Sequence, residues 1–211
     1  MVTARRPLAQ PQTLVVQAEK YLAWMRMRHF SPLTVRERKR MLGWFVRWCE
    51  ERDVAKPEDV TRAVLLQYQK WLYAYRKASG KPLVVQTQHG RLTAVRSFFR
   101  YMVKSGVLAA NATADIDMPR LPKGRLPRGV LTREEAERLL SQPDVAAPLG
   151  LRDRAMLEVF YSTGIRRSEL VSLKLPAIDM EAGTVTILEG KGRRDRVVPI
   201  GERAMGWLDK Y

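Results

Sequence analysis

Apolar residues recur at helical spacing through the first half of the chain. Ser31 and Pro32 are the residue types favoured at an N-cap and at the first position of a helix. The apolar pattern predicts four helices, at about residues 14–28, 31–51, 61 to a turn at 78–82, and 84–104. These helices together predict a helical domain over residues 13–114, preceded by a loose N-terminus at 1–12.

Two of these helices carry a basic or polar stripe beside the apolar one. Arg36, Arg40 and Arg47 fall together about a third of a turn from the apolar stripe of the second helix. Arg100 and Lys104 lie along a neighbouring face of the fourth helix. A run of charges is most often a solvated face, but two such stripes in one helical domain favour contact with DNA.

The tryptophans and tyrosines of these helices have two interpretations. Exposed aromatic rings can stack on the bases of single-stranded nucleic acid. Their helical spacing, however, is typical of residues that pack in a core. The second interpretation is the one that we expect for this domain.

The pattern changes after residue 114. Residues 115–130 contain four basic residues, three prolines and two glycines, which indicates a basic, extended linker. Thr132 and Glu135 then form a T-x-x-E capping box at the start of a helix. Further on, two β-rich runs flank a Gly-Lys-Gly turn at 190–192 and predict a hairpin. Residues 131–211 therefore read as a second domain of mixed α/β type.

The charge of the chain narrows the class of partner. Lys and Arg number 38 against 22 Asp and Glu, a formal net charge of +16. This excess points to a polyanion, most often nucleic acid, with an anionic membrane surface or mere solubility as alternatives. The single cysteine, Cys49, excludes an internal disulfide and a cysteine-based metal site, and we expect it to be a small buried hydrophobe. No apolar run is long enough to span a membrane and the N-terminus lacks a signal peptide, so we expect a soluble, cytoplasmic protein.

Two segments carry the most specific pattern, and they read YSTGIRRSELVSLKL (161–175) and ILEGKGRRDRVVPIG (187–201). In this order, and with the helical stretch before them, they resemble the tyrosine site-specific recombinases of the phage integrase family, most of all the Xer type. The resemblance implies a multidomain, mainly α protein. It comprises an N-terminal SAM-like four-helix core-binding domain and the first part of a mixed α/β catalytic domain with a β-hairpin. It also implies cleavage and rejoining of duplex DNA through a 3′-phosphotyrosyl intermediate, without a metal or other cofactor.

The resemblance assigns roles to individual residues. Arg166 matches the first catalytic arginine, which neutralises charge on the phosphate, and Lys191 matches the hairpin lysine, a general acid for the leaving oxygen. Arg167 occupies a variable place and is expected to be solvated. Glu169 matches an acidic residue whose expected role is to brace the loop by pairing with a nearby cation. Further phosphate-binding capacity surrounds the hairpin turn, in Arg193, Arg194 and Arg196.

The sequence departs from the family after the hairpin. No His-x-x-Arg element follows it, and both histidines, His29 and His89, lie in the helical domain. Tyr211 lies on the helix directly after the hairpin, so it is expected to be a packing residue and not the nucleophile. We therefore expect a catalytically incomplete portion of a recombinase, a monomer in solution that meets itself or a related recombinase on DNA. The alternative is a non-catalytic DNA-binding protein that occupies recombination sites or regulates an intact recombinase.

Overall fold

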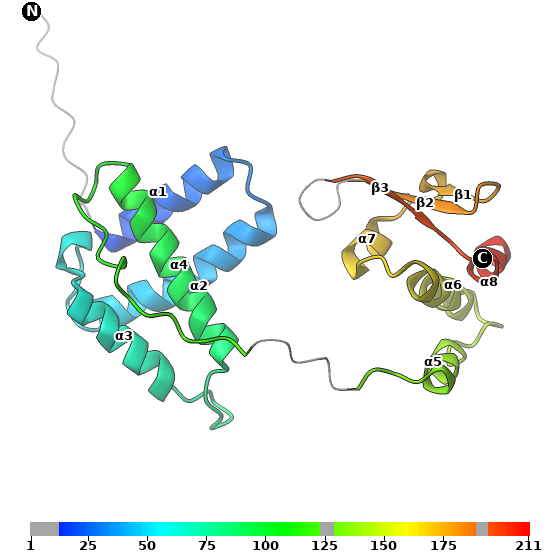
Figure 1. Cartoon of the computed structure of the whole chain (residues 1–211), viewed down its shortest axis with the longest axis horizontal. Coiled ribbons are helices and arrows are strands. Elements are labelled where there is room, and N and C mark those ends of the chain that lie inside the picture. The colour runs from blue at the N-terminus through cyan, green and yellow to red at the C-terminus, as the bar shows by residue number, and fades with distance from the viewer. Residues whose placement is uncertain (1–12, 123–128, 189–193) are drawn as a thin grey trace, which may run out of the picture. The chain divides into compact units, whose positions relative to one another are not determined.

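The chain folds into two compact units, which are Met1–Arg125 and Leu126–Tyr211 (Figure 1). The computed structural model describes residues 13–122, 129–188 and 194–211. The N-terminus that was expected to be loose, 1–12, lies outside the described residues, as does part of the expected linker. Each unit has a hydrophobic core of its own.

The first unit is helical, as the apolar pattern predicts. Ser31 caps its second helix, where its hydroxyl oxygen accepts a hydrogen bond from the backbone N of Thr34 at 3.2 Å. Thr61 caps the third helix in the same way, and Gly106 follows the fourth with a φ of 73°, which favours glycine. The elements are α1 (Leu14–Met27), α2 (Pro32–Glu50), the 3₁₀ turn η1 (Pro57–Asp59), α3 (Arg62–Ala74) and α4 (Val85–Lys104).

Aromatic rings form the centre of the first core. The Phe45 ring lies edge-on to Tyr68 at 5.0 Å and to Phe99 at 6.2 Å between centroids, which joins α2, α3 and α4. All three side chains are fully buried. The expectation that the tryptophans and tyrosines pack in a core is confirmed for Tyr21, Trp48 and Tyr68, whereas Tyr73 is exposed. Cys49 is also fully buried, and burial raises the pKa of its thiol to about 12, so it behaves as a small hydrophobe.

Arg91 of α4 is a buried cation that the sequence did not reveal. Its guanidinium lies 4.2 Å from the centroid of the Trp44 ring and 5.9 Å from that of Tyr75. Burial lowers the pKa of Arg91, and the two aromatic faces compensate part of its lost hydration. The side chain therefore joins α2 and α4 to the end of α3.

The first unit extends beyond residue 114. Ile116 is buried in the same core, and the Gln69 side-chain amide donates to the Asp117 carbonyl at 2.9 Å. The first residues of the segment expected to be a linker thus pack on the first unit. They do so because Ile116 and Met118 are apolar and pack in or against the first core.

The second unit combines four helices with a three-stranded antiparallel sheet in its described residues (Figure 1). The predicted capping box is present, since Thr132 and Glu135 exchange hydrogen bonds of 2.9 and 3.2 Å. The predicted hairpin is formed by β2 and β3, whereas β1 was not predicted from the sequence. The elements are α5 (Arg133–Leu140), α6 (Pro148–Thr163), α7 (Arg167–Ser172), η2 (Leu175–Ala177), β1 (Ile178–Asp179), β2 (Thr184–Ile187), β3 (Arg196–Pro199) and α8 (Glu202–Lys210).

A buried carboxylate ties three helices of the second unit together. Glu158 of α6 accepts hydrogen bonds from Arg154 at 2.7 Å and from Arg203 of α8 at 2.8 Å. Arg203 also pairs with Glu137 of α5 at 2.7 Å. Tyr211, expected to be a packing residue, is 61% exposed, because it follows α8 and the described elements do not cover it.

We predict that truncation at the centre of the first core destabilises that unit. Phe99→Ala should lower the free energy of unfolding by about 3–5 kcal/mol, because it leaves a cavity beside Phe45. The exposed neighbour Arg100→Ala is the matched control and should change it by less than about 0.5 kcal/mol. Urea unfolding followed by tryptophan fluorescence measures this, since Trp24, Trp44, Trp48 and Trp71 all lie in the first unit. Equal effects of the two substitutions would contradict the packing described.

Candidate functional site

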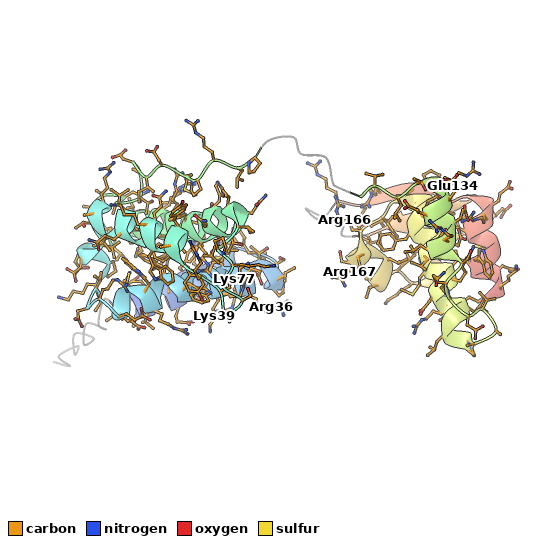
Figure 2. The ribbon with its side chains drawn as sticks, turned by 90° about the horizontal axis from the view of Figure 1, so that it is seen from below. Arg36, Lys39, Lys77, Glu134, Arg166 and Arg167 are labelled. Carbon is orange, nitrogen blue, oxygen red and sulfur yellow. The ribbon has the colours of Figure 1, made fainter. Side chains whose placement is uncertain are left out.

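The turn between α6 and α7 positions Arg166. Gly164 ends α6 with a φ of 60°, a conformation that favours glycine, and its N–H donates to the Phe160 carbonyl. Ile165 is buried in the core of the second unit and fixes the backbone. Arg166 is then the N-cap residue of α7, with a side chain that is 54% exposed (Figure 2).

Glu169 is the hydrogen-bond centre of this turn. One carboxylate oxygen accepts from Arg166 Nη1 at 2.9 Å and from Arg196 Nη1 at 3.0 Å. The other accepts from the backbone N of Arg166 at 2.7 Å and from Arg196 Nη2 at 2.7 Å. A carboxylate offers about four acceptor positions, so all are filled.

The charge state of Glu169 follows from these bonds. The hydrogen bonds from Arg196, followed by the one from the Arg166 backbone, lower the pKa of this carboxyl to about 2. The group is therefore ionised at neutral pH, and no acceptor position is open for a transferred proton. This geometry fits a brace better than a proton carrier.

A polar cavity of about 390 Å³ opens beside this turn, and its lining residues are Gly164, Arg166, Arg194 and Arg196. Three guanidinium groups against one carboxylate leave the site positive. Guanidinium groups bind phosphate with directed, often bidentate hydrogen bonds, so the cavity suits a phosphate-like anion. Arg167 (Figure 2) is exposed at the start of α7, and it is not among the described residues that line the cavity.

Two further site residues were predicted between the two β-rich runs. Lys191 and Arg193 lie outside the described residues, so their roles stay predictions. In the described parts of the chain, no three potential metal ligands gather in one place. No helix in those parts is long and apolar enough to cross a membrane.

The basic residues predicted on α2 are all exposed, but they are not equivalent. Arg36 and Arg47 make no ion pair with other described residues, and Arg36 lies on the surface of α2 (Figure 2). Arg40 pairs with Glu37 at 2.6 Å, a local contact that the sequence interpretation did not consider. Part of its charge is therefore compensated within the helix.

On α4, the predicted basic residues are open to solvent, whereas the polar residues one and two turns before them are not. Arg100 and Lys104 are exposed. Thr93 and Ser97 are half-buried, and the Ser97 hydroxyl donates to the Thr93 carbonyl at 2.9 Å. This hydrogen bond lies within α4, so these polar groups are partly used by the helix.

We predict a pH dependence of stability that Glu169 generates. Because its folded pKa of about 2 lies below its ordinary value of 4.5, its contribution is fully present above pH 4.5 and is lost as the pH falls toward 2. Glu169→Gln should destabilise the second unit at neutral pH and weaken the loss of stability between pH 4.5 and 2. Hydrogen exchange of the buried strand β2, measured across this range, reports the effect. Glu181→Gln, an exposed change in the same unit, is the control, and an unchanged profile in Glu169→Gln would refute the prediction.

Comparisons with known proteins agree with this architecture. Residues 129–211 match the phage integrase family. The chain is 47% identical to tyrosine recombinase XerC 2 of Ralstonia nicotianae over 182 residues, which are 86% of this chain and 52% of that protein. It is 46% identical to tyrosine recombinase XerD of Pseudomonas aeruginosa over 120 residues, which are 57% of this chain and 39% of that protein. The chain therefore spans about half or less of these two relatives.

Solved structures share the fold. A λ integrase dimer bound to a COC′ core site aligns with a TM-score of 0.66 at 18% identity, over 94% of this chain and 67% of that one. The Tn1549 transposon integrase in complex with circular intermediate DNA gives 0.61 at 18% identity, over 92% of this chain and 63% of that one. The second unit thus matches the phage integrase family, the chain is a homologue of the Xer-type tyrosine recombinases over about half of their length, and the solved integrases share its fold.

Proposed function

We propose that the chain is part of a site-specific DNA recombinase. In this proposal the first unit binds duplex DNA, and the second unit binds the phosphate of the phosphodiester that is cleaved. The observation that carries this proposal is the cavity lined by Arg166, Arg194 and Arg196, two of which pair with the Glu169 carboxylate. The net charge of +16 and the unpaired Arg36 and Arg47 support a polyanionic partner. The relatives are tyrosine recombinases, and the aligned integrases are bound to DNA.

The chemistry proposed is transfer of a DNA phosphodiester to a tyrosine and back. Attack by the tyrosine oxygen forms a 3′-phosphotyrosyl bond as the DNA oxygen leaves, and a DNA hydroxyl later reverses the exchange, so the bond energy is kept. Arg166 would neutralise the charge that gathers on the non-bridging oxygens, and Lys191 would protonate the leaving oxygen. A segment that supplies the His-x-x-Arg element and the tyrosine completes the site, and Tyr211 is not that tyrosine.

On this proposal the 211-residue chain binds DNA without cleaving it. We propose that it is a monomer in free solution, which light scattering can check, and that it acts in the cytoplasm. A duplex site selected from a random pool provides the specific DNA that the following two experiments need.

We predict that DNA binding is steeply salt-dependent, because each phosphate contact releases counterions. Arg36→Gln and Arg47→Gln should each reduce the slope of log K against log salt by about 1. The matched control is Arg62→Gln, which removes the same charge from the exposed first turn of α3. Fluorescence anisotropy with a labelled duplex gives the slopes. If the control lowers the slope as much as the two α2 variants do, the α2 face is not the contact surface.

We predict that the chain forms no covalent adduct with a suicide DNA substrate that carries the selected site. Arg166→Ala should weaken binding to this substrate by about 10-fold or more, as expected for loss of a charge-assisted contact to phosphate. Denaturing electrophoresis detects adducts, and anisotropy measures the binding. An adduct that disappears in Tyr211→Phe would overturn the assignment of Tyr211, and unchanged binding by Arg166→Ala would remove the phosphate site.

A further inference from the structure

We infer that Arg196 is a positioning residue for Arg166, acting through Glu169, and that the anion in the cavity is bound by Arg166 and Arg194 instead. The choice of a phosphate-like anion rests on the proposed function, whereas the positioning role does not. The sequence alone does not distinguish the roles of Arg166, Arg194 and Arg196, because all three lie within the same two motifs.

The terminal nitrogens of Arg196 are both engaged. Nη1 donates to one oxygen of Glu169 at 3.0 Å and Nη2 to the other at 2.7 Å, a bidentate pair. The partners lie 27 residues apart, so the pair attaches the first residue of β3 to α7. The pair fixes the plane and direction of the Arg196 guanidinium, so the carboxylate sets its orientation.

Arg166 has more of its guanidinium available. Only its Nη1 donates to Glu169, at 2.9 Å, and neither Nε nor Nη2 donates to another described residue. Its side chain is 54% exposed, against 36% for Arg196. Arg194 makes no hydrogen bond or ion pair with the described part of the chain, although it lines the cavity. Among the described residues, Arg166 and Arg194 therefore have more N–H donors without a protein partner than Arg196, two of whose five N–H groups bind Glu169.

By sharing Glu169, Arg196 also leaves the positive charge of Arg166 available to an anion. Arg166, Glu169 and Arg196 together carry a charge of +1, whereas Arg166 and Glu169 alone would carry none. Without Arg196, the carboxylate would compensate Arg166 fully and compete with an incoming anion. A lysine at position 196 would keep the positive charge but not the bidentate hydrogen bonds, since an ammonium is a point charge without the planar arrangement of N–H groups of a guanidinium.

The test uses the full 211-residue chain, without DNA, and the variant Arg196→Lys. Titration of the Glu169 carboxyl, followed by its ¹³C NMR signal, should give a pKa near 2 in the unmodified chain. In Arg196→Lys the pKa should rise toward its ordinary value of 4.5, because one hydrogen bond of the fork is lost. The matched control is Arg194→Lys, which should leave the titration of Glu169 unchanged. An equal titration in Arg196→Lys and the unmodified chain would overturn the positioning role.

A second measurement needs no variant, so it is independent of whether the substituted chains fold. Inorganic phosphate is added to the unmodified chain while the Nε–H signals of the three arginines are followed. The signals of Arg166 and Arg194 should shift with phosphate and that of Arg196 should not. An Arg196 signal that shifts as strongly as that of Arg166 would make it a ligand and overturn the inference. If no signal shifts but Arg196→Lys still moves the Glu169 titration, the positioning role holds and the phosphate site of the proposed function fails.

Discussion

A buried carboxylate cannot remain unpaired, and this constraint organises the second unit. An ionised group removed from water needs partners that replace its hydration. Glu169 is 7% exposed and takes its donors from α7 and β3. Glu158 is 1% exposed and takes its donors from α6 and α8. In each case two arginines share one carboxylate, so the unit joins elements that lie far apart in the sequence through charge as well as through apolar contact.

The same constraint distinguishes arginines that support the scaffold from arginines whose charge stays available. Arg154, Arg196 and Arg203 are paired with buried carboxylates, and their guanidinium groups support the scaffold. Arg36 and Arg47 make no ion pair with other described residues, so their charge stays available to a partner. A net charge of +16 therefore does not measure binding capacity directly, because the pairing of each cation decides what it can bind.

The sequence predicted those features that arise from neighbouring residues. The helix starts at Ser31, Thr61 and Thr132 follow from a side chain and a backbone N–H three positions on, and the buried stripe of α2 follows from helical spacing. The spacing of apolar residues does not show that Leu139 is half exposed beside the buried Leu140, because a short amphipathic helix buries only a narrow face.

Contacts between residues far apart in the sequence could not be predicted from the sequence. Nothing local indicates that Arg196 contacts a carboxylate 27 positions earlier, or that Arg203 contacts one 45 positions earlier. Arg91 between aromatic rings is hidden for the same reason, since Trp44 and Tyr75 lie on other helices. The family resemblance pointed to Arg166 and Glu169 but could not say which arginines keep their donors open. That distinction depends on hydrogen bonds that only the folded chain displays.

Preorganisation explains why the turn at Arg166 is built around a carboxylate rather than left to solvent. An arginine side chain carries about 2 kcal/mol of rotamer entropy, which a flexible residue would lose on binding an anion. Ile165 fixes the backbone of Arg166 from one side, and Glu169 holds both its backbone N–H and its Nη1 from the other. Much of that entropy is therefore lost on folding, and an anion entering the cavity meets donors that already have their geometry. Such fixed donors act most strongly where charge develops during a reaction, because they need no rearrangement at that moment.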